Sequence, residues 1–107
     1  MDLPARDVDL IRQWAFRTNS VREVWLFGSR AKGTARPDSD VDIGIYLMPP
    51  AGGADWALAT YPEMGDWWQR DLATLLGRHV SLEAMIAGSP NEKEVRRGVL
   101  LWTRPGT

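Results

Sequence analysis

Two strand-like runs joined by a polar loop constrain the fold of this chain more than any other feature of its sequence. Residues 21–27 are rich in branched and aromatic side chains and run straight into a glycine–serine pair. Residues 41–48 alternate between apolar and polar or small side chains, as in a β-strand, and Asp40 and Asp42 stand at their start. The pattern predicts two strands whose connecting loop gathers small and acidic residues at one place.

The glycine–serine pair, Gly28 and Ser29, is suited to hold an anion. Without a Cβ atom, Gly28 lets the backbone approach a ligand closely. Ser29 offers a hydroxyl and begins a turn whose backbone N–H groups can point at a phosphate. Arg30 could meet that phosphate, although a loop cation could equally be solvated or paired with Asp38. The loop is therefore a candidate phosphate cradle.

The two aspartates Asp40 and Asp42 lie two residues apart on a predicted strand, so both side chains project from the same face. Two adjacent carboxylates repel each other unless a cation lies between them, and hard oxygen ligands favour Mg²⁺. A phosphate cradle beside a divalent-metal pair is the equipment for phosphoryl or nucleotidyl transfer. The sequence thus predicts a site for Mg²⁺ and a nucleoside triphosphate.

Rival motifs can be tested on the same loop. A second glycine follows Gly28 at P-loop spacing, but Thr34 stands where that motif requires a lysine. An EF-hand calcium loop that starts at Asp38 would need a glycine and a glutamate where the sequence has Ile43 and Pro49. Both motifs are excluded. A glycosyltransferase Asp-x-Asp site stays formally open, although 107 residues is short for a usual sugar-nucleotide domain.

The full pattern, Gly28 and Ser29 followed after ten residues by Asp40 and Asp42, resembles the signature of the DNA polymerase β-like nucleotidyltransferases. The intervening loop is similar to that of their minimal nucleotidyltransferase (MNT) branch. The resemblance implies Mg²⁺ and ATP as cofactors and transfer of a nucleoside monophosphate to a hydroxyl. It also implies that Gly28 and Ser29, with Arg30 beside them, hold the triphosphate. Asp40 and Asp42 would be the catalytic carboxylates that bind the metal.

A protein partner is also implied by the resemblance. Many MNT proteins are antitoxins paired with a helical HEPN-type ribonuclease toxin, and some transfer AMP to a tyrosine of that toxin. The alternative is a catalytically weakened module of the same fold, which neutralises its partner by forming a complex. The sequence does not fix the acceptor, the base of the nucleotide or the oligomeric state, and it leaves a homo-oligomer open.

One position departs from the family pattern. Active members carry a third carboxylate on the next core strand, and Ser81 stands at that place. Serine cannot be a general base at neutral pH. Glu83 shares the face of Ser81, about 7 Å further along the strand, and its longer side chain could partly bridge the gap. The departure leaves enzymatic activity open, and it favours a site that binds nucleotide and metal but transfers slowly or not at all.

Length and composition limit the number of domains, the fold class and the kinds of site that the chain can have. The 107 residues fit one domain over 1–107, of the α/β (α+β) class, with a mixed sheet of three to four strands and flanking helices. The absence of cysteine excludes disulfides, cysteine-bound zinc and thiol catalysis, and suits a cytoplasmic protein. A net charge of −1 gives no strong nucleic-acid signal, and no apolar stretch reaches the roughly 20 residues that span a membrane.

The remaining elements follow from apolar periodicity and turn residues. We expect helices over 4–17, 66–76 and 90–98, strands over 21–27, 41–48 and 79–85, a helical turn after Ser29, a short helical piece at 55–60, an ordered end at 100–102 and fraying at 104–107. Trp67 and Trp68 point about 100° apart on their helix, so one is expected in the core, and the other could face a partner. His79 is expected to be an ordinary strand-edge residue.

Overall fold

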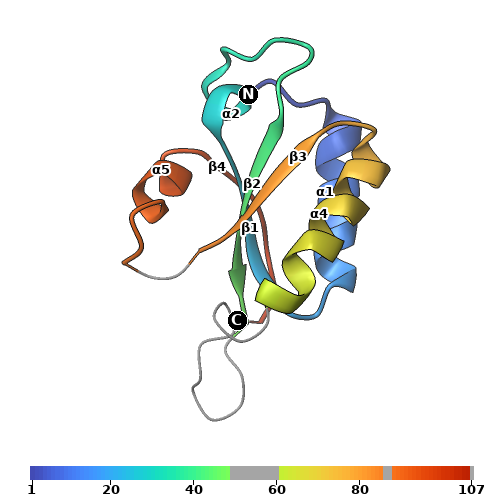
Figure 1. Ribbon diagram of the computed structural model, residues 1–107, viewed down its shortest axis with the longest axis vertical. Helices are drawn as coiled ribbons and strands as arrows, with labels where there is room; N and C mark the ends of the chain where they lie inside the picture. The colour runs from blue at the N-terminus through green and yellow to red at the C-terminus, as the bar shows by residue number, and fades with distance from the viewer. Residues whose placement is uncertain (49–60, 86–87, 107) are drawn as a thin grey trace.

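The computed structural model describes residues 1–48, 61–85 and 88–106 (Figure 1). In chain order the elements are α1 (Ala5–Arg17), β1 (Val21–Phe27), α2 (Gly28–Lys32), β2 (Val41–Leu47), α4 (Tyr61–Leu76), β3 (Val80–Ala84), α5 (Glu92–Arg96) and β4 (Val99–Thr103). The short helical piece expected at 55–60 lies outside the described residues. None of the described helices is long and apolar enough to cross a membrane.

The described strands form one mixed sheet in the order β3-β2-β1-β4. β1 runs antiparallel to both β2 and β4, whereas β2 and β3 are parallel. Helices α1 and α4 lie together on one face of the sheet, α5 lies on the other side, and α2 lies at the end of β1 (Figure 1). The predicted mixed sheet with flanking helices is therefore confirmed, with four strands among the described residues.

The face under α1 and α4 holds the main hydrophobic core. The apolar positions of β2, Val41, Ile43 and Ile45, have no exposed surface, as their alternation predicts. Trp14 of α1 meets Trp68 of α4 edge to face, with the ring centroids 6.4 Å apart. Burial of each large side chain of this kind stabilises the fold by about 1.5–3 kcal/mol.

The opposite face holds a smaller core of Tyr46, Met85 and Val95, against which Trp25 and Phe27 pack. Tyr46 is buried although strict alternation places it away from the main core, because α5 covers this part of the sheet. α5 is shorter than the helix predicted over 90–98. The sheet therefore buries side chains on both faces near its middle.

The start of α5 is not capped by a side-chain hydrogen bond. Ser89 does not cap the helix with its hydroxyl; its carbonyl accepts a hydrogen bond from the amide of Glu92 instead (3.2 Å). Asn91 holds the N-cap position and makes no side-chain capping bond. The α4 helix, in turn, begins at Tyr61 and is longer than the predicted 66–76.

The chain end is more ordered than the predicted fraying at 104–107 indicates. The guanidinium of Arg104 donates to the carbonyls of Ala15 and Thr18 (3.0 Å each) and of Val21 (2.8 Å). The last carbonyls of a helix lack partners within it and carry partial negative charge, which a cation satisfies. Arg104 thus ties the end of β4 to the end of α1, and the prediction of fraying is wrong at this residue.

Candidate functional site

The tightest contact of the site lies between Gly28 and Asp42. Phe27, the last residue of β1, is in register with Asp42 on β2, so the chain reaches Gly28 directly beside the carboxylate. Gly28 has a φ of +72°, and a Cβ atom there would lie 2.2 Å from Asp42 Oδ2. Only glycine satisfies both the left-handed backbone and the close approach. The structure therefore brings together two of the predicted site residues.

Ser29 lies in the short helix α2 and is partly exposed. Its carbonyl accepts hydrogen bonds from the amide (3.0 Å) and the hydroxyl (3.4 Å) of Thr34. The turn closes at Gly33, whose φ is +77°. These bonds fix the backbone around Ser29 and leave its hydroxyl without a protein partner among the described residues.

Arg30 has a position that the sequence did not reveal. It is only 4% exposed, and its guanidinium donates to the carbonyls of Asp2 (2.9 Å), Pro37 (3.2 Å) and Ser39 (2.8 Å). The Asp2 carboxylate in turn accepts a bond from the amide of Ala35 (3.1 Å). The arginine and the N-terminal segment therefore hold the loop between Gly33 and Asp40 in shape, and a phosphate contact by Arg30 stays a prediction.

The two aspartates differ in environment: Asp40 is exposed and Asp42 is half-buried. Burial raises the pKa of Asp42 above its ordinary value, and the negative charges of Asp40 and Glu83 raise that pKa further. No ion pair within the described residues neutralises either aspartate. Carboxylate oxygens under uncompensated negative charge fit a divalent cation such as Mg²⁺.

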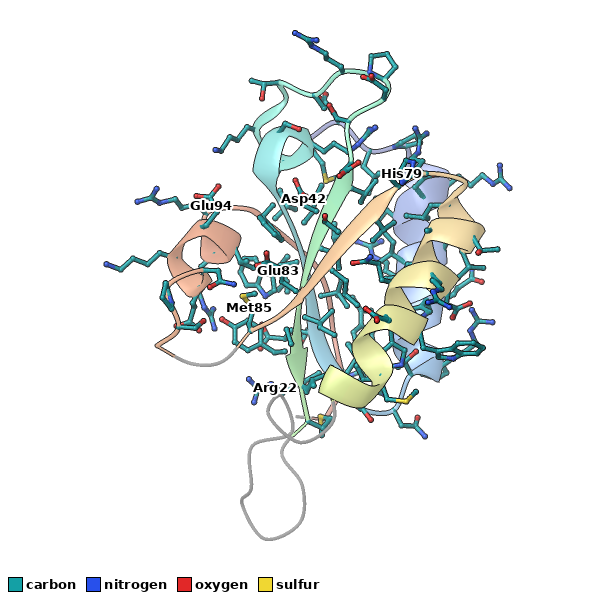
Figure 2. The ribbon with its side chains drawn as sticks, in the orientation of Figure 1. Arg22, Asp42, His79, Glu83, Met85 and Glu94 are labelled. Carbon is teal, nitrogen blue, oxygen red and sulfur yellow. The ribbon has the colours of Figure 1, made fainter. Side chains whose placement is uncertain are left out.

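Ser81 and Glu83 lie on the neighbouring strand. In the parallel pairing of β2 with β3, Ser81 is opposite Asp42, and Glu83 is opposite Gly44. Asp42 and Glu83 are labelled on these two neighbouring strands in Figure 2. Glu83 therefore lies on the face of Asp42, one step further along the sheet. Among the described residues, no three His, Asp, Glu or Cys side chains converge as a preformed metal cluster. The aspartate pair therefore stays a predicted donor set at this end of the sheet.

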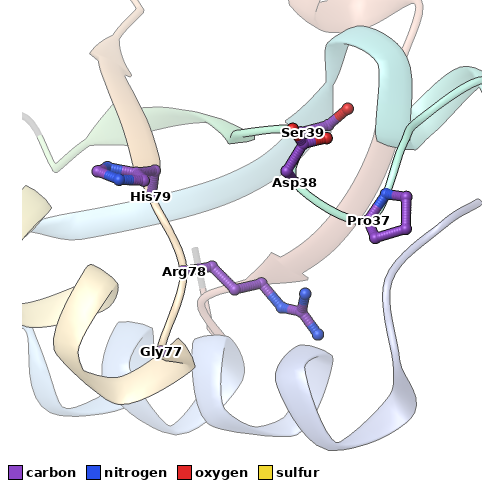
Figure 3. A pocket seen from close by; sticks show the side chains of 6 residues that line it. All are labelled: Pro37, Asp38, Ser39, Gly77, Arg78 and His79. Atoms are coloured by element: carbon purple, nitrogen blue, oxygen red, sulfur yellow. The ribbon is translucent and has the colours of Figure 1, made fainter.

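A small pocket adjoins the site between two loops (Figure 3). It has a volume of about 220 Å³ and is lined by Pro37, Asp38, Ser39, Gly77, Arg78 and His79. Arg78 is drawn to the helix layer by the buried Asp7 (Nε to Oδ2, 2.8 Å), and the His79 carbonyl accepts the amide of Val41 (2.9 Å). Ligand pockets usually enclose about 300–1,000 Å³, so this hollow is small for a whole nucleotide.

Several residues that shape the site gave no signal in the sequence. Asp2 accepts a bond from the amide of a loop residue more than 30 positions away, and Asn91, just before α5, donates to Glu83 Oε2 (2.8 Å). Asparagine next to a helix is read from sequence as a cap. Neither contact has a local pattern that sequence reasoning could detect.

The chain is similar in sequence and fold to known proteins. A family model described as a nucleotidyltransferase domain matches residues 6–95. No curated protein sequence is significantly similar to the chain.

Three solved structures show the same fold. A toxin–antitoxin structure with AMP-PNP is 24% identical, with a TM-score of 0.65, over 92% of this chain and 74% of that one. The toxin–antitoxin MntA–HepT structure is 20% identical, with a TM-score of 0.60, over 92% and 71% of the two chains. A putative nucleotidyltransferase from Sulfolobus solfataricus is 22% identical, with a TM-score of 0.52, over 91% and 77%.

Proposed function

Since the chain belongs to the nucleotidyltransferase domain family, we propose that it transfers a nucleoside monophosphate from ATP to a hydroxyl group of a protein partner. The contact between Gly28 and Asp42 carries this proposal, because it joins the candidate phosphate cradle to the candidate metal ligands. In this proposal Gly28 and Ser29 contact the triphosphate. Asp40 and Asp42 hold Mg²⁺, which supplies charge neutralisation on the phosphates.

Arg30 contributes to nucleotide binding through the loop that it holds. Its guanidinium is occupied by three backbone carbonyls, so its effect on a phosphate passes through the position of the turn around Ser29. Arg30 is in this sense a positioning residue. The hydroxyl of the partly exposed Ser29 and the backbone of the turn remain available to the ligand.

The proposed partner is a helical toxin of the HEPN type, and the chain would act as its cytoplasmic antitoxin. Support comes from the fold shared with the toxin–antitoxin structures, one of them solved with AMP-PNP. An exposed aromatic side chain, Trp67 (65% exposed), lies on the outer side of α4, as expected for one of the two adjacent tryptophans. Trp68 is the one that enters the core.

A second candidate function is neutralisation of the partner by complex formation alone. One observation favours it: Ser81 lies in register with Asp42, at the place where active members carry a carboxylate. In that case the chain would bind the nucleotide and the toxin without efficient transfer. The two functions share the binding site and differ in chemistry.

The first experiment is calorimetric titration of the protein with ATP, with and without Mg²⁺. We expect magnesium-dependent binding that is lost in the Asp40→Asn/Asp42→Asn variant. Gly28→Ala should also abolish binding, whereas Gly33→Ala is the matched control, because a Cβ at Gly33 meets no atom within 4 Å although its φ is similar. Absence of binding in every condition would remove the transfer function and leave complex formation alone as the candidate.

Transfer is then tested with ATP labelled at the α-phosphate. The acceptor is the small helical protein encoded next to this chain, if the gene order provides one. Label on that protein supports the enzyme, whereas tight complex formation without label supports the binding module.

A further inference from the structure

Helix α5 is fixed on the sheet by several independent contacts. Val95 sits against Gly44, where an added Cβ would lie 2.7 Å from Val95 Cγ1. The Tyr46 hydroxyl donates to Glu92 Oε2 (2.5 Å) and accepts from Arg96 Nε (3.1 Å). The Arg96 guanidinium also lies over the Tyr46 ring, 5.0 Å from its centroid. The residue that precedes the helix, Asn91, is therefore held at a defined distance from β3.

Asn91 uses its side chain on Glu83 rather than on its own helix. Its Nδ2 donates to Glu83 Oε2 at 2.8 Å, and no side-chain capping bond competes with this contact. A neutral amide fixes the position of a carboxylate without neutralising its charge. The second oxygen of Glu83, Oε1, has no hydrogen bond from a described residue.

The other glutamates around this face are already engaged. Glu92 accepts from Tyr46, Glu94 pairs with Lys32 (3.5 Å), and Glu23 accepts from Trp25 Nε1 (3.0 Å). Glu83 differs from them because its one described partner is the uncharged Asn91. It also lies on the face of Asp42, one strand away.

We infer that Glu83, oriented by Asn91, accepts the proton of the attacking hydroxyl in place of the missing carboxylate at Ser81. This rests on the proposed nucleotidyl transfer. The acceptor oxygen bonds to the α-phosphorus of ATP, and the bond from that phosphorus to the β-phosphate oxygen breaks. Pyrophosphate leaves with the electron pair, and the acceptor proton moves to Glu83 Oε1. Glu83 is then the catalytic residue, and Asn91 is its positioning residue.

The test compares Glu83→Gln and Asn91→Ala in the full chain, with Mg–ATP and the partner protein as acceptor. Glu83→Gln should lower turnover by about 100-fold, the usual loss for a general base, and Asn91→Ala by about 10-fold. The double variant should be no slower than Glu83→Gln, because Asn91 acts through Glu83. Calorimetric affinity for Mg–ATP should change by less than about two-fold in both, since neither residue binds the nucleotide.

Three controls separate positioning from a merely structural role. Asn19→Ala makes the same truncation in the exposed turn before β1, away from the site, and should leave turnover unchanged. Nitrogen-15 spectra of the side-chain amides should show the Asn91 resonance shifted in Glu83→Gln, with the rest of the spectrum preserved. Ser81→Asp should restore turnover to both variants, because it supplies a carboxylate opposite Asp42.

Three outcomes overturn the inference: the first leaves the proposed transfer standing, and the other two remove that transfer as well. Wild-type turnover in Glu83→Gln removes Glu83 from the chemistry while transfer itself stands. A protein that binds Mg–ATP and transfers only as Ser81→Asp shows that Glu83 does not substitute, and supports the binding module. Failure of the wild type to bind Mg–ATP removes the proposed function as well.

Discussion

The two faces of the sheet are stabilised in different ways. Under α1 and α4, contact is made by apolar side chains such as Ile11 and Leu72, which have no exposed surface. Under α5, a smaller apolar core that includes Val95 at Gly44 is joined by polar contacts such as the Tyr46 hydroxyl on Glu92. The apolar face supplies most of the stability, and the α5 face sets the positions of individual polar groups. The candidate site lies on the α5 face, where the contacts fix the positions of polar groups and bury less apolar area.

The largest effect is expected from the apolar face. Trp14→Ala should lower the free energy of unfolding by about 3–5 kcal/mol, because it removes a fully buried ring packed on Trp68. Phe16→Ala, on the same helix but 64% exposed, should change it by less than about 0.5 kcal/mol. Denaturant unfolding measures both. Similar losses for the two variants would contradict the assignment of the core to this face.

A smaller loss is expected where α5 meets the sheet. Gly44→Ala should cost about 1–3 kcal/mol, because its new methyl group overlaps Val95 Cγ1. The Gly44→Ala/Val95→Ala variant should be more stable than the sum of the single losses predicts, since the second change makes room for the first. Chemical denaturation of the four proteins in the cycle gives the coupling. Strict additivity would show that this contact does not hold α5.

The acidic site should respond to pH in a defined direction. The pKa of Asp42 is raised in the folded protein, so the folded state binds this proton more tightly than the unfolded state does. Stability from this group is therefore present below the ordinary aspartate pKa and is lost as the pH rises through the folded value. Asp42→Asn should raise the melting temperature at pH 7 and leave it nearly unchanged at pH 3.

Stabilisation by Mg²⁺ gives a second test of the role of Asp42. If Asp42 helps to hold the cation, Mg²⁺ at neutral pH should stabilise the wild type and not Asp42→Asn, because a ligand stabilises the state that binds it. Thermal melts at several Mg²⁺ concentrations measure this. An equal shift of both proteins would assign the effect to non-specific screening.

The smallest effect is expected from the surface ion pair between α2 and α5. Lys32 and Glu94 are 3.5 Å apart with side chains 61% and 44% exposed, so Lys32→Ala should change stability by about 0–1 kcal/mol. The change should shrink further in high salt. A loss above this range in denaturant unfolding would mean that the pair, rather than Val95 and Tyr46, anchors α5.

Local sequence patterns were enough to predict strands β1 and β2 and the helical turn α2. β1 begins and ends where the run of branched and aromatic residues does, and α2 is the helical turn expected after Ser29. β2 follows from its alternation, and the mixed sheet was implied by the resemblance that the Gly-Ser and Asp-x-Asp spacing carries. These features depend on residues close together in the chain, so periodicity and turn chemistry report them. The roles of Gly28, Ser29, Arg30, Asp40 and Asp42 toward a ligand stay predictions.

The tertiary structure decided what depends on distant residues. Only pairing with β1 makes the segment after α5 a strand, and only the end of α1 gives Arg104 its carbonyl partners. The sequence shows Arg30 as a loop cation, and only the fold supplies the backbone carbonyls to which its guanidinium donates. Likewise, the bond from Asn91 to Glu83 exists because α5 packs on the sheet at Gly44 and Tyr46. Sequence determines which groups are present, but the partner that each polar group finds is set by the whole fold, since a directed bond needs both ends in place.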